Sequence, residues 1–235
     1  MDQNAMKEQA GKAAVDALVR DGMTLGLGSG STAITAVRYI GGLVQQGGLR
    51  NIKAVTTSFQ TELECEKWHI PLYSLNAPEI NGALDLTIDG ADQIDHKHFC
   101  VKGGGGALLL EKLAAYASKV YAIVVDETKL VDMLGKTFPV AVEIIPESRV
   151  FVCRELAKLG ADCTLREAAR KTGPVVTDHG NVLLDISFKG GNIVYPALLE
   201  EQINHIPGVI ENGFFTKKGP HVFVAHADGS VAIWD

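Results

Sequence analysis

The sequence predicts an α/β protein in which a parallel sheet with helices on both faces is followed by a smaller α+β domain. In the first half of the chain, short apolar runs alternate with amphipathic helical segments, which is typical of a parallel sheet. After roughly residue 130 the order becomes strand, helix, strand, strand, helix, strand, which resembles a split βαβ unit. The length of 235 residues suits one large domain or two modest ones.

The first elements are a helix, a short strand and a second helix. Residues 5–20 place alanines and a leucine on one stripe, and Asp21-Gly22 ends this predicted helix. MTLGLGSG, residues 23–30, is a short strand that breaks into a glycine loop. STAITAVRYIGGL then predicts a helix, with Ser31 or Thr32 as the candidate N-cap.

The same alternation continues to roughly residue 127. Apolar runs predict strands, and segments with polar residues at helical spacing predict helices. The expected elements are strands at 52–58, 71–75, 83–89 and 119–127, and helices at 59–68 and 106–118.

The second half begins with a strand at 138–145 and an amphipathic helix at 147–160. Residues 162–168 and the long alternation at 175–188 indicate an antiparallel sheet that contains a hairpin. A further helix, 196–206, is entered through its proline.

The last predicted element is a pair of strands in HVFVAHADGSVAIW, joined by an Asp-Gly turn. We place this pair back on the first domain. The expected domains are therefore 1–133 plus 207–235, and 134–206.

Composition and charge exclude several classes of protein. With a net charge of −6, the chain has no overall positive potential that would attract nucleic acid. An anionic ligand must therefore be bound by a few local lysines or backbone amides. Four scattered cysteines without C-x-x-C spacing favour a reducing cytosol over disulfides or a zinc site. The polar N-terminus is unlike a signal peptide, and no apolar run reaches the roughly 20 residues that cross a bilayer.

The first chemistry-bearing stretch is GLGSGSTA, residues 26–33, which follows a predicted strand. Its glycines expose backbone N–H groups at a helix N-terminus, which is a favourable place for a phosphate. The dinucleotide motif fails because Ser31 stands where its last glycine belongs, and the Walker pattern lacks its lysine. The alternative is a tight strand–helix turn with no ligand.

The second stretch is DLTIDGADQID, residues 85–95, in which a strand ends at Asp89 and Asp92 follows three residues later. Two carboxylates at this edge of a sheet can bind sugar hydroxyls or transfer protons. A calcium loop is rejected because Thr87 and His96 occupy positions that need acidic ligands. His96 and His98 are interpreted as surface histidines on a turn, and no metal site is expected.

The third stretch is KGGGGALLLEK, residues 102–112. Lys102 and the glycine amides can bind an anion, and Glu111 shares a helix face with small apolar residues. Loss of hydration would make this glutamate a better general base near neutral pH. The alternative is a solvated glutamate beside Lys112. The leucines expected to anchor the core are Leu109, Leu110 and Leu113.

Together, GLGSGSTA, TTS, DGAD, KGGGGAL and VVDETK, with FPVAVE and VTDHGN in the second half, closely resemble the A-type ribose-5-phosphate isomerases. The resemblance covers nearly the whole chain. It implies a Rossmann-like catalytic domain and a smaller ferredoxin-like α+β domain. Gln93 departs from the usual acid after DGAD, and the tail from 217 onward also differs.

The resemblance also implies the site residues. Glu111 is expected to transfer the proton, with Asp89, Lys102 and Asp92 as its catalytic partners. The substrate-binding residues expected from the family are Lys7, Ser29, Gly30, Ser31, Thr32, Asp89, Gly90, Ala91, Asp92, Lys102, Gly103, Gly104, Gly105 and Lys129. Considered alone, Lys7 and Lys129 would each be interpreted as solvated surface charges.

The expected reaction interconverts D-ribose 5-phosphate and D-ribulose 5-phosphate through a cis-enediolate, in the non-oxidative branch of the pentose phosphate pathway. Neither a metal nor another cofactor is expected. We expect a cytoplasmic homodimer or homotetramer that binds a small sugar phosphate and neither nucleic acid nor membrane. The alternatives are a sugar-phosphate-sensing domain and an amino-sugar-phosphate isomerase or deaminase.

Overall fold

The computed structural model describes residues 1–188 and 193–235, which form two compact units. The first unit comprises Met1–Ala91, Leu110–Lys129 and Lys218–Asp235, and the second comprises Asp92–Leu109 and Leu130–Lys217. The sequence-based division placed 92–109, 130–133 and 207–217 in the first domain, whereas these units group them with the second. The domain boundaries stay a prediction.

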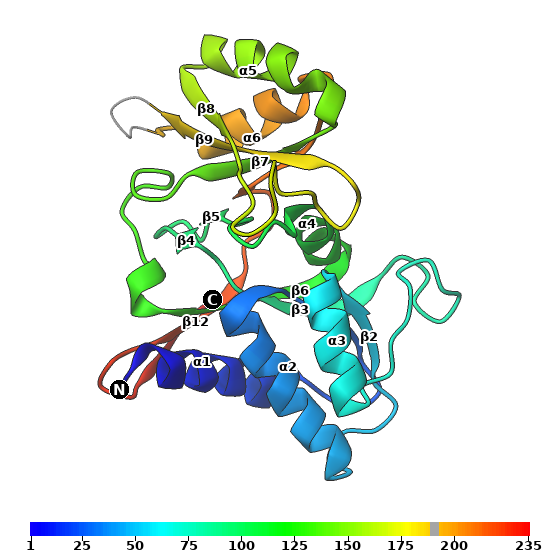
Figure 1. Cartoon of the computed structure of the whole chain (residues 1–235). Coiled ribbons are helices and arrows are strands. Elements are labelled where there is room, and N and C mark those ends of the chain that lie inside the picture. The colour runs from blue at the N-terminus through cyan, green and yellow to red at the C-terminus, as the bar shows by residue number, and fades with distance from the viewer. Residues whose placement is uncertain (189–192) are drawn as a thin grey trace. The chain divides into compact units, whose positions relative to one another are not determined.

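The first unit is built on a six-stranded sheet in the order β13-β12-β6-β3-β1-β2 (Figure 1). Five strands run parallel to their neighbours, as predicted, and only β13 is antiparallel to β12. Since β12 pairs with β6, the chain's last strands do return to the first unit. The strands are β1 Thr24–Leu27, β2 Lys53–Thr56, β3 Leu84–Asp89, β6 Ser118–Asp126, β12 His221–Ala225 and β13 Val231–Trp234.

Helices cover both faces of this sheet, which confirms the predicted layering. Helices α1 (Gln3–Leu18) and α2 (Gly30–Gln45) enclose a large apolar core with strand residues such as Leu86. Helix α4 (Leu108–Ala117) packs on the opposite face, where Ala114 belongs to a separate apolar cluster. Helix α3 spans Phe59–Trp68, as predicted from its sequence, and packs against α2.

Two predictions of secondary structure in this unit are wrong. The N-cap of α2 is Ser29, not Ser31 or Thr32, because the helix already begins at Gly30. The expected strand at 71–75 is a single bridge between Ala54 and Leu72.

The second unit contains a four-stranded antiparallel sheet in the order β10-β7-β9-β8. The first strand therefore lies between the fourth and the third, which is the arrangement expected of a ferredoxin-like domain. Of the predicted hairpin at 175–188, only the second half is a strand, and Val176 contributes one isolated bridge to Val182. The elements are β7 Val140–Ile144, α5 Arg149–Lys158, β8 Ala161–Leu165, β9 Val182–Phe188, α6 Pro196–Asn204 and β10 Val209–Asn212.

This unit also contains a three-stranded sheet that was not predicted from the sequence. It consists of β4 (Gln93–Ile94), β5 (Cys100–Val101) and β11 (Phe214–Phe215), in the order β11-β5-β4. Two-residue strands are too short to show an alternating pattern, so the sequence carries no periodic signal for them. Lys102, one of the predicted site residues, follows β5 directly.

Candidate active site

In the first unit, Asp89 links the loops that follow two neighbouring strands. Asp89 ends β3 and is fully buried. Its Oδ1 accepts hydrogen bonds from the backbone N–H of Ser29, at 3.1 Å, and of Gly90, at 2.7 Å. A carboxylate that accepts backbone N–H bonds stabilises both loops in one arrangement.

Gly28 lies so close to Asp89 that only glycine fits. A Cβ at position 28 would overlap the Asp89 carboxylate and lie 2.6 Å from the Asp89 Cα. The close approach of Asp89, at the end of β3, therefore requires a glycine at position 28.

A hydroxyl network surrounds the predicted glycine loop. Ser29 Oγ lies 2.7 Å from Thr57 Oγ1 and donates to Ser58 Oγ at 2.6 Å. The N–H of Gly30 donates to Gln60 Oε1 at 3.1 Å. Thr57, Ser58 and Gln60 were not predicted as site residues. The TTS run that begins at the last residue of β2 was a usable signal for the first two, since β2 ends at the same edge as β1.

Lys7 is brought to the same loop by α1. Its Nζ donates to Ser31 Oγ at 3.0 Å, in the first turn of α2. A pocket of about 380 Å³ opens here, lined by Asn4, Lys7, Glu8, Ser31, Ile34, Thr35, Arg38 and Gln60. An ammonium group beside a hydroxyl at a helix N-terminus is an arrangement that can hold a phosphate.

Glu111 lies in the first turn of α4 and is only 5% exposed. The expected alternative, a solvated glutamate, does not hold, and Lys112 is buried as well. Burial among apolar neighbours such as Ala114 and Ala115 removes water from the carboxylate, which suits a general base.

The leucines expected to anchor the core do not do so. Leu113 is 48% exposed, and Leu109 and Leu110 are only partly buried. The buried residues of α4 are instead Leu108, Ala114 and Ala115, together with Glu111 and Lys112. Three adjacent leucines, residues 108–110, cannot all lie on one face of a helix. Their sequence therefore did not show which of them would be buried.

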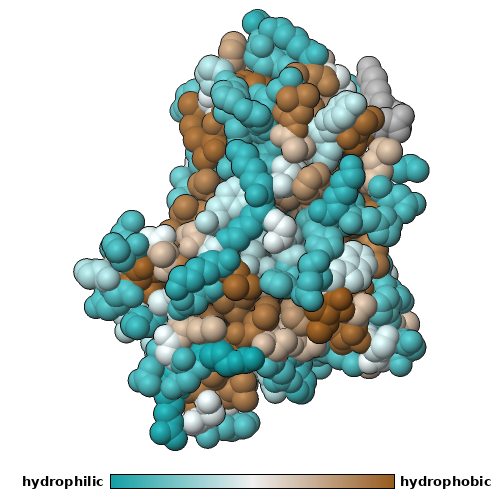
Figure 2. Space-filling model, turned by 180° about the vertical axis from the view of Figure 1, so that it is seen from behind, coloured by the Kyte–Doolittle hydropathy of each residue, from teal (hydrophilic) through white to brown (hydrophobic). Residues whose placement is uncertain are grey.

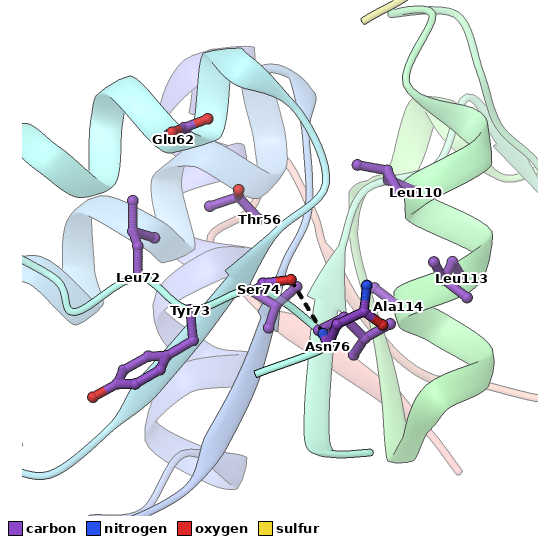
Figure 3. A pocket seen from close by; sticks show the side chains of 11 residues that line it. Thr56, Glu62, Leu72, Tyr73, Ser74, Asn76, Leu110, Leu113 and Ala114 are labelled. Atoms are coloured by element: carbon purple, nitrogen blue, oxygen red, sulfur yellow. Dashed lines mark hydrogen bonds between the residues drawn. The ribbon is translucent and has the colours of Figure 1, made fainter. Parts of the chain in front are cut away.

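Leu110 and Leu113 line a different pocket of about 470 Å³ beside the edge strand β2 (Figure 3). The opposite wall comes from the segment Leu72–Asn76, in which the Asn76 N–H donates to Ser74 Oγ at 3.1 Å. None of the predicted site residues lines this pocket.

Lys129 belongs to a 3-10 turn, η1, spanning Glu127–Lys129 after β6. It is half-buried, at the strand end predicted for it. The preceding Asp126 is fully buried and accepts hydrogen bonds from Gln3 Nε2 at 3.3 Å and Thr128 N at 3.0 Å. Asp126 thereby fixes the start of the turn that presents Lys129.

In the second unit, Lys102 is 3% exposed and held at both ends. Its backbone N–H donates to Gly213 O at 2.9 Å. Its Nζ lies 5.4 Å from the centroid of the Phe215 ring, within cation–π range. An aromatic face stabilises a charged ammonium group in a place with little water.

The glycine run after Lys102 forms a turn in which the Gly106 N–H donates to Gly103 O at 3.0 Å. Gly103 has a φ of +98°, and a Cβ there would lie 2.9 Å from Ala141 Cβ. Asp92 Oδ2 accepts from the Gly104 N–H at 2.7 Å, so the structure brings the predicted Asp92 and the glycine run together.

Gln93, which departs from the family pattern, is buried in the second unit. Its Oε1 accepts from the Gly135 N–H at 2.7 Å, and its Nε2 donates to Thr137 Oγ1 at 2.7 Å. A carboxylate at this position could also accept from the Gly135 N–H, and it could accept from the Thr137 hydroxyl, so these two contacts do not by themselves require an amide.

His96 Nε2 lies 3.5 Å from Asp132 Oδ1, and both side chains are highly exposed. Across 1–188 and 193–235, no three His, Cys, Asp or Glu side chains gather as a metal site would require. No helix in those same ranges has the length and apolar character to span a bilayer.

Comparisons with known proteins show which family the sequence matches. The family model of ribose 5-phosphate isomerase A (phosphoriboisomerase A) matches residues 53–229. The chain is 48% identical to ribose-5-phosphate isomerase A of Treponema denticola, over 98% of this chain and 99% of that protein.

Solved structures extend the likeness to the fold. Ribose 5-phosphate isomerase A of Methanocaldococcus jannaschii superimposes with a TM-score of 0.91 at 38% identity, over 98% of each chain. A D-ribose-5-phosphate isomerase in complex with phospho-erythronic acid superimposes with a TM-score of 0.95 at 36% identity, over the whole of both chains. On sequence and fold together, the chain belongs to the ribose 5-phosphate isomerase A family.

Proposed function

We propose that this chain interconverts D-ribose 5-phosphate and D-ribulose 5-phosphate by moving one proton between C2 and C1 through a cis-enediolate. The observation that carries the proposal is the full-length likeness to an isomerase solved with phospho-erythronic acid. That acid has a phosphate at one end and a carboxylate at the other. We propose that it also binds this chain, in competition with the sugar phosphate.

Glu111 is the proposed proton carrier. Its 5% exposure supports this role, because a poorly hydrated carboxylate accepts a proton more readily than a solvated one. A positioned base contributes roughly 10²- to 10⁴-fold to rate. The same carboxylate returns the proton to the neighbouring carbon, so the reaction needs no electron acceptor.

Lys102 and the glycine amides that follow it are the proposed partners of the growing oxyanion. A removed proton leaves negative charge on the sugar oxygens, and a preorganised donor is worth about 3 kcal/mol in the transition state. The position of Lys102 over the Phe215 ring supports a charged ammonium group, and the low exposure of Lys102 supports a fixed one. Asp89 and Asp92 are proposed to bind sugar hydroxyls and assist ring opening.

The phosphate is proposed to bind at the N-terminus of α2. Ser31 and Thr32 lie in the first turn of that helix, and Lys7 Nζ already contacts Ser31 Oγ. Lys129 is proposed as a further cation for the substrate. Binding energy from this remote group fixes the reacting carbons against the base.

We further propose that the chain works as a homodimer or homotetramer in the cytoplasm. Both units expose large apolar side chains, and brown patches interrupt the hydrophilic surface in Figure 2. Such patches often mark protein interfaces. The exposed large apolar side chains include Phe59, Leu63 and Leu113 in the first unit, and Val150, Phe151 and Leu198 in the second.

A coupled assay tests the proposed substrate. The purified chain should turn over ribose 5-phosphate far faster than hexose phosphates or amino-sugar phosphates, and EDTA should leave this activity intact. Faster turnover of an amino-sugar phosphate would point to the isomerase or deaminase alternative. Binding of ribose 5-phosphate without any turnover would point to a sensing domain.

A further inference from the structure

Arg166 contacts the glycine turn that follows Lys102, and neither motif nor charge pattern predicted it. It lies just after β8, and its backbone N–H donates to Leu183 O at 2.9 Å. Its Nη1 donates to two consecutive carbonyl oxygens, Gly103 O at 2.9 Å and Gly104 O at 3.1 Å. All of these residues belong to the second unit.

Asp185 on β9 anchors this guanidinium from its other edge. Arg166 Nε donates to Asp185 Oδ2 at 2.9 Å, and Nη2 donates to Oδ1. The side chains are 15% and 23% exposed, so the pair is shielded from water. A bidentate ion pair fixes the plane of the guanidinium as well as its position.

The two carbonyl contacts determine where two backbone N–H groups point. In a trans peptide, the carbonyl of one residue and the N–H of the next point in opposite directions. Holding Gly103 O and Gly104 O on Arg166 therefore directs the N–H groups of Gly104 and Gly105 away from it.

These two N–H groups have different partners. The Gly104 N–H donates to Asp92 Oδ2 at 2.7 Å. The Gly105 N–H makes no hydrogen bond to any residue in the described part of the chain, and Gly105 is exposed. The turn thus presents one oriented donor that remains for a ligand.

Arg166 also strengthens that donor. A cation bound to a carbonyl oxygen withdraws electrons from the peptide unit, which makes the N–H of the same unit a better donor. Gly104 O and Gly105 N–H share one peptide unit. The guanidinium therefore both aims and polarises the Gly105 N–H.

We propose that Arg166, anchored by Asp185, is a positioning residue that holds the Gly105 N–H as a donor to the charge that develops on the sugar oxygens. The proposal rests on the isomerase function above. It adds a specific donor and the residue that controls it. The guanidinium acts through the peptide unit and does not itself contact the substrate.

The first test compares Arg166→Met and Arg166→Lys with the wild-type chain. Arg166→Met should lower kcat by about 10- to 100-fold, part of the effect of losing one oxyanion donor. Arg166→Lys should recover part of the loss, because an ammonium group can still bind a carbonyl oxygen. Arg20→Met is the matched control, since Arg20 also donates to backbone carbonyls, at the end of α1, and should retain wild-type kcat.

A second test separates donor orientation from general damage to the fold. Inhibition by phospho-erythronic acid should weaken about 10-fold in Arg166→Met, because its carboxylate meets the Gly105 N–H. Inhibition by inorganic phosphate should stay within about twofold, because phosphate binds at α2. Equal weakening of both inhibitors, or of neither, would overturn the proposal.

The amide resonance of Gly105 gives a readout that does not depend on turnover. Phospho-erythronic acid should move it downfield in the wild-type chain, and clearly less in Arg166→Met. An unmoved wild-type resonance would contradict the inference. Absence of isomerase activity in a chain that shows the shift would refute only the proposed function and leave Arg166 as the positioner of an anion site.

Discussion

Asp89 shows how one carboxylate oxygen can fix two loops of the proposed site. It accepts from Ser29 and Gly90, which follow different strands of the same sheet. The close approach of Gly28 makes this possible, because a side chain there would occupy the carboxylate's space. The absence of a side chain at Gly28 thus leaves the space that the Asp89 carboxylate occupies.

Gly28→Ala should displace Asp89 and disturb both loops. We expect a loss of about 1–3 kcal/mol in the free energy of unfolding, together with a fall in kcat of at least about tenfold. Chemical denaturation and the coupled assay measure the two effects. Gly42→Ala in α2 is the control, because a Cβ there meets no atom within 4 Å and a helical alanine is favoured. Equal stability of the two variants would contradict the steric account.

At this scale the sequence named candidate site residues, which stay a prediction, but gave little sign of their surroundings. The glycine loops, Asp89 and Glu111 could be named because glycines and carboxylates after strands carry a chemical meaning. Arg166 and Gln60 could not, since each is an ordinary polar residue until the fold brings it to a backbone group. The burial of Lys112 had no signal in the sequence either.

At the scale of elements, the amino ends of β1 and β3 are joined by a side chain. Asp85 Oδ2 accepts from the Thr24 N–H at 2.9 Å, and Oδ1 accepts from Lys119 Nζ at 2.8 Å. These contacts, Lys119 first, lower the pKa of Asp85 from 3.8 to about 2. This cluster lies at the sheet edge opposite the proposed site and serves strand pairing.

The lowered pKa of Asp85 predicts a pH-dependent contribution to stability. Because the pKa is lower in the folded chain than in the unfolded one, the contribution is complete above about pH 4 and is lost as pH falls towards 2. Asp85→Asn should cost about 1 kcal/mol at pH 7, after allowance for solvent screening around the exposed Lys119. The difference from wild type should shrink below about pH 4 in urea titrations. A constant difference from pH 7 to pH 2 would contradict this assignment.

Elements with a strong period were predictable, and short ones were not. Strand β6 follows from its long apolar run, and the order of elements in the second unit indicated its ferredoxin-like sheet. Strands β4, β5 and β11 have two residues each, so pairing between distant segments creates them. The strand predicted at 71–75 is wrong although the segment is apolar. Only Leu72 pairs with a neighbouring strand, through an isolated bridge to Ala54.

At the scale of the molecule, the first unit depends on residues from both ends of the chain. Strand β12 pairs with β6, and Phe223 on β12 is 1% exposed in the core that α1 and α2 cover. The central sheet therefore depends on β12, which is distant from β6 in the sequence.

Phe223→Ala should destabilise the chain by about 3–5 kcal/mol, because it leaves a cavity in this core. For a protein of this size the midpoint of thermal unfolding should fall by about 10 °C. Ile233→Ala on β13 is the matched control: Ile233 pairs with Phe223 across the strands but is 52% exposed. Similar midpoints for both variants would show that β12 contributes little to the core.

The most direct test of the proposed mechanism is single-site replacement of the base. Glu111→Gln keeps the size of the side chain and removes its ability to accept the proton. It should lower kcat about 10³-fold while the affinity for phospho-erythronic acid stays within about threefold of wild type. Turnover within tenfold of wild type, in a variant that binds the acid normally, would contradict the assignment of Glu111 as the proton carrier.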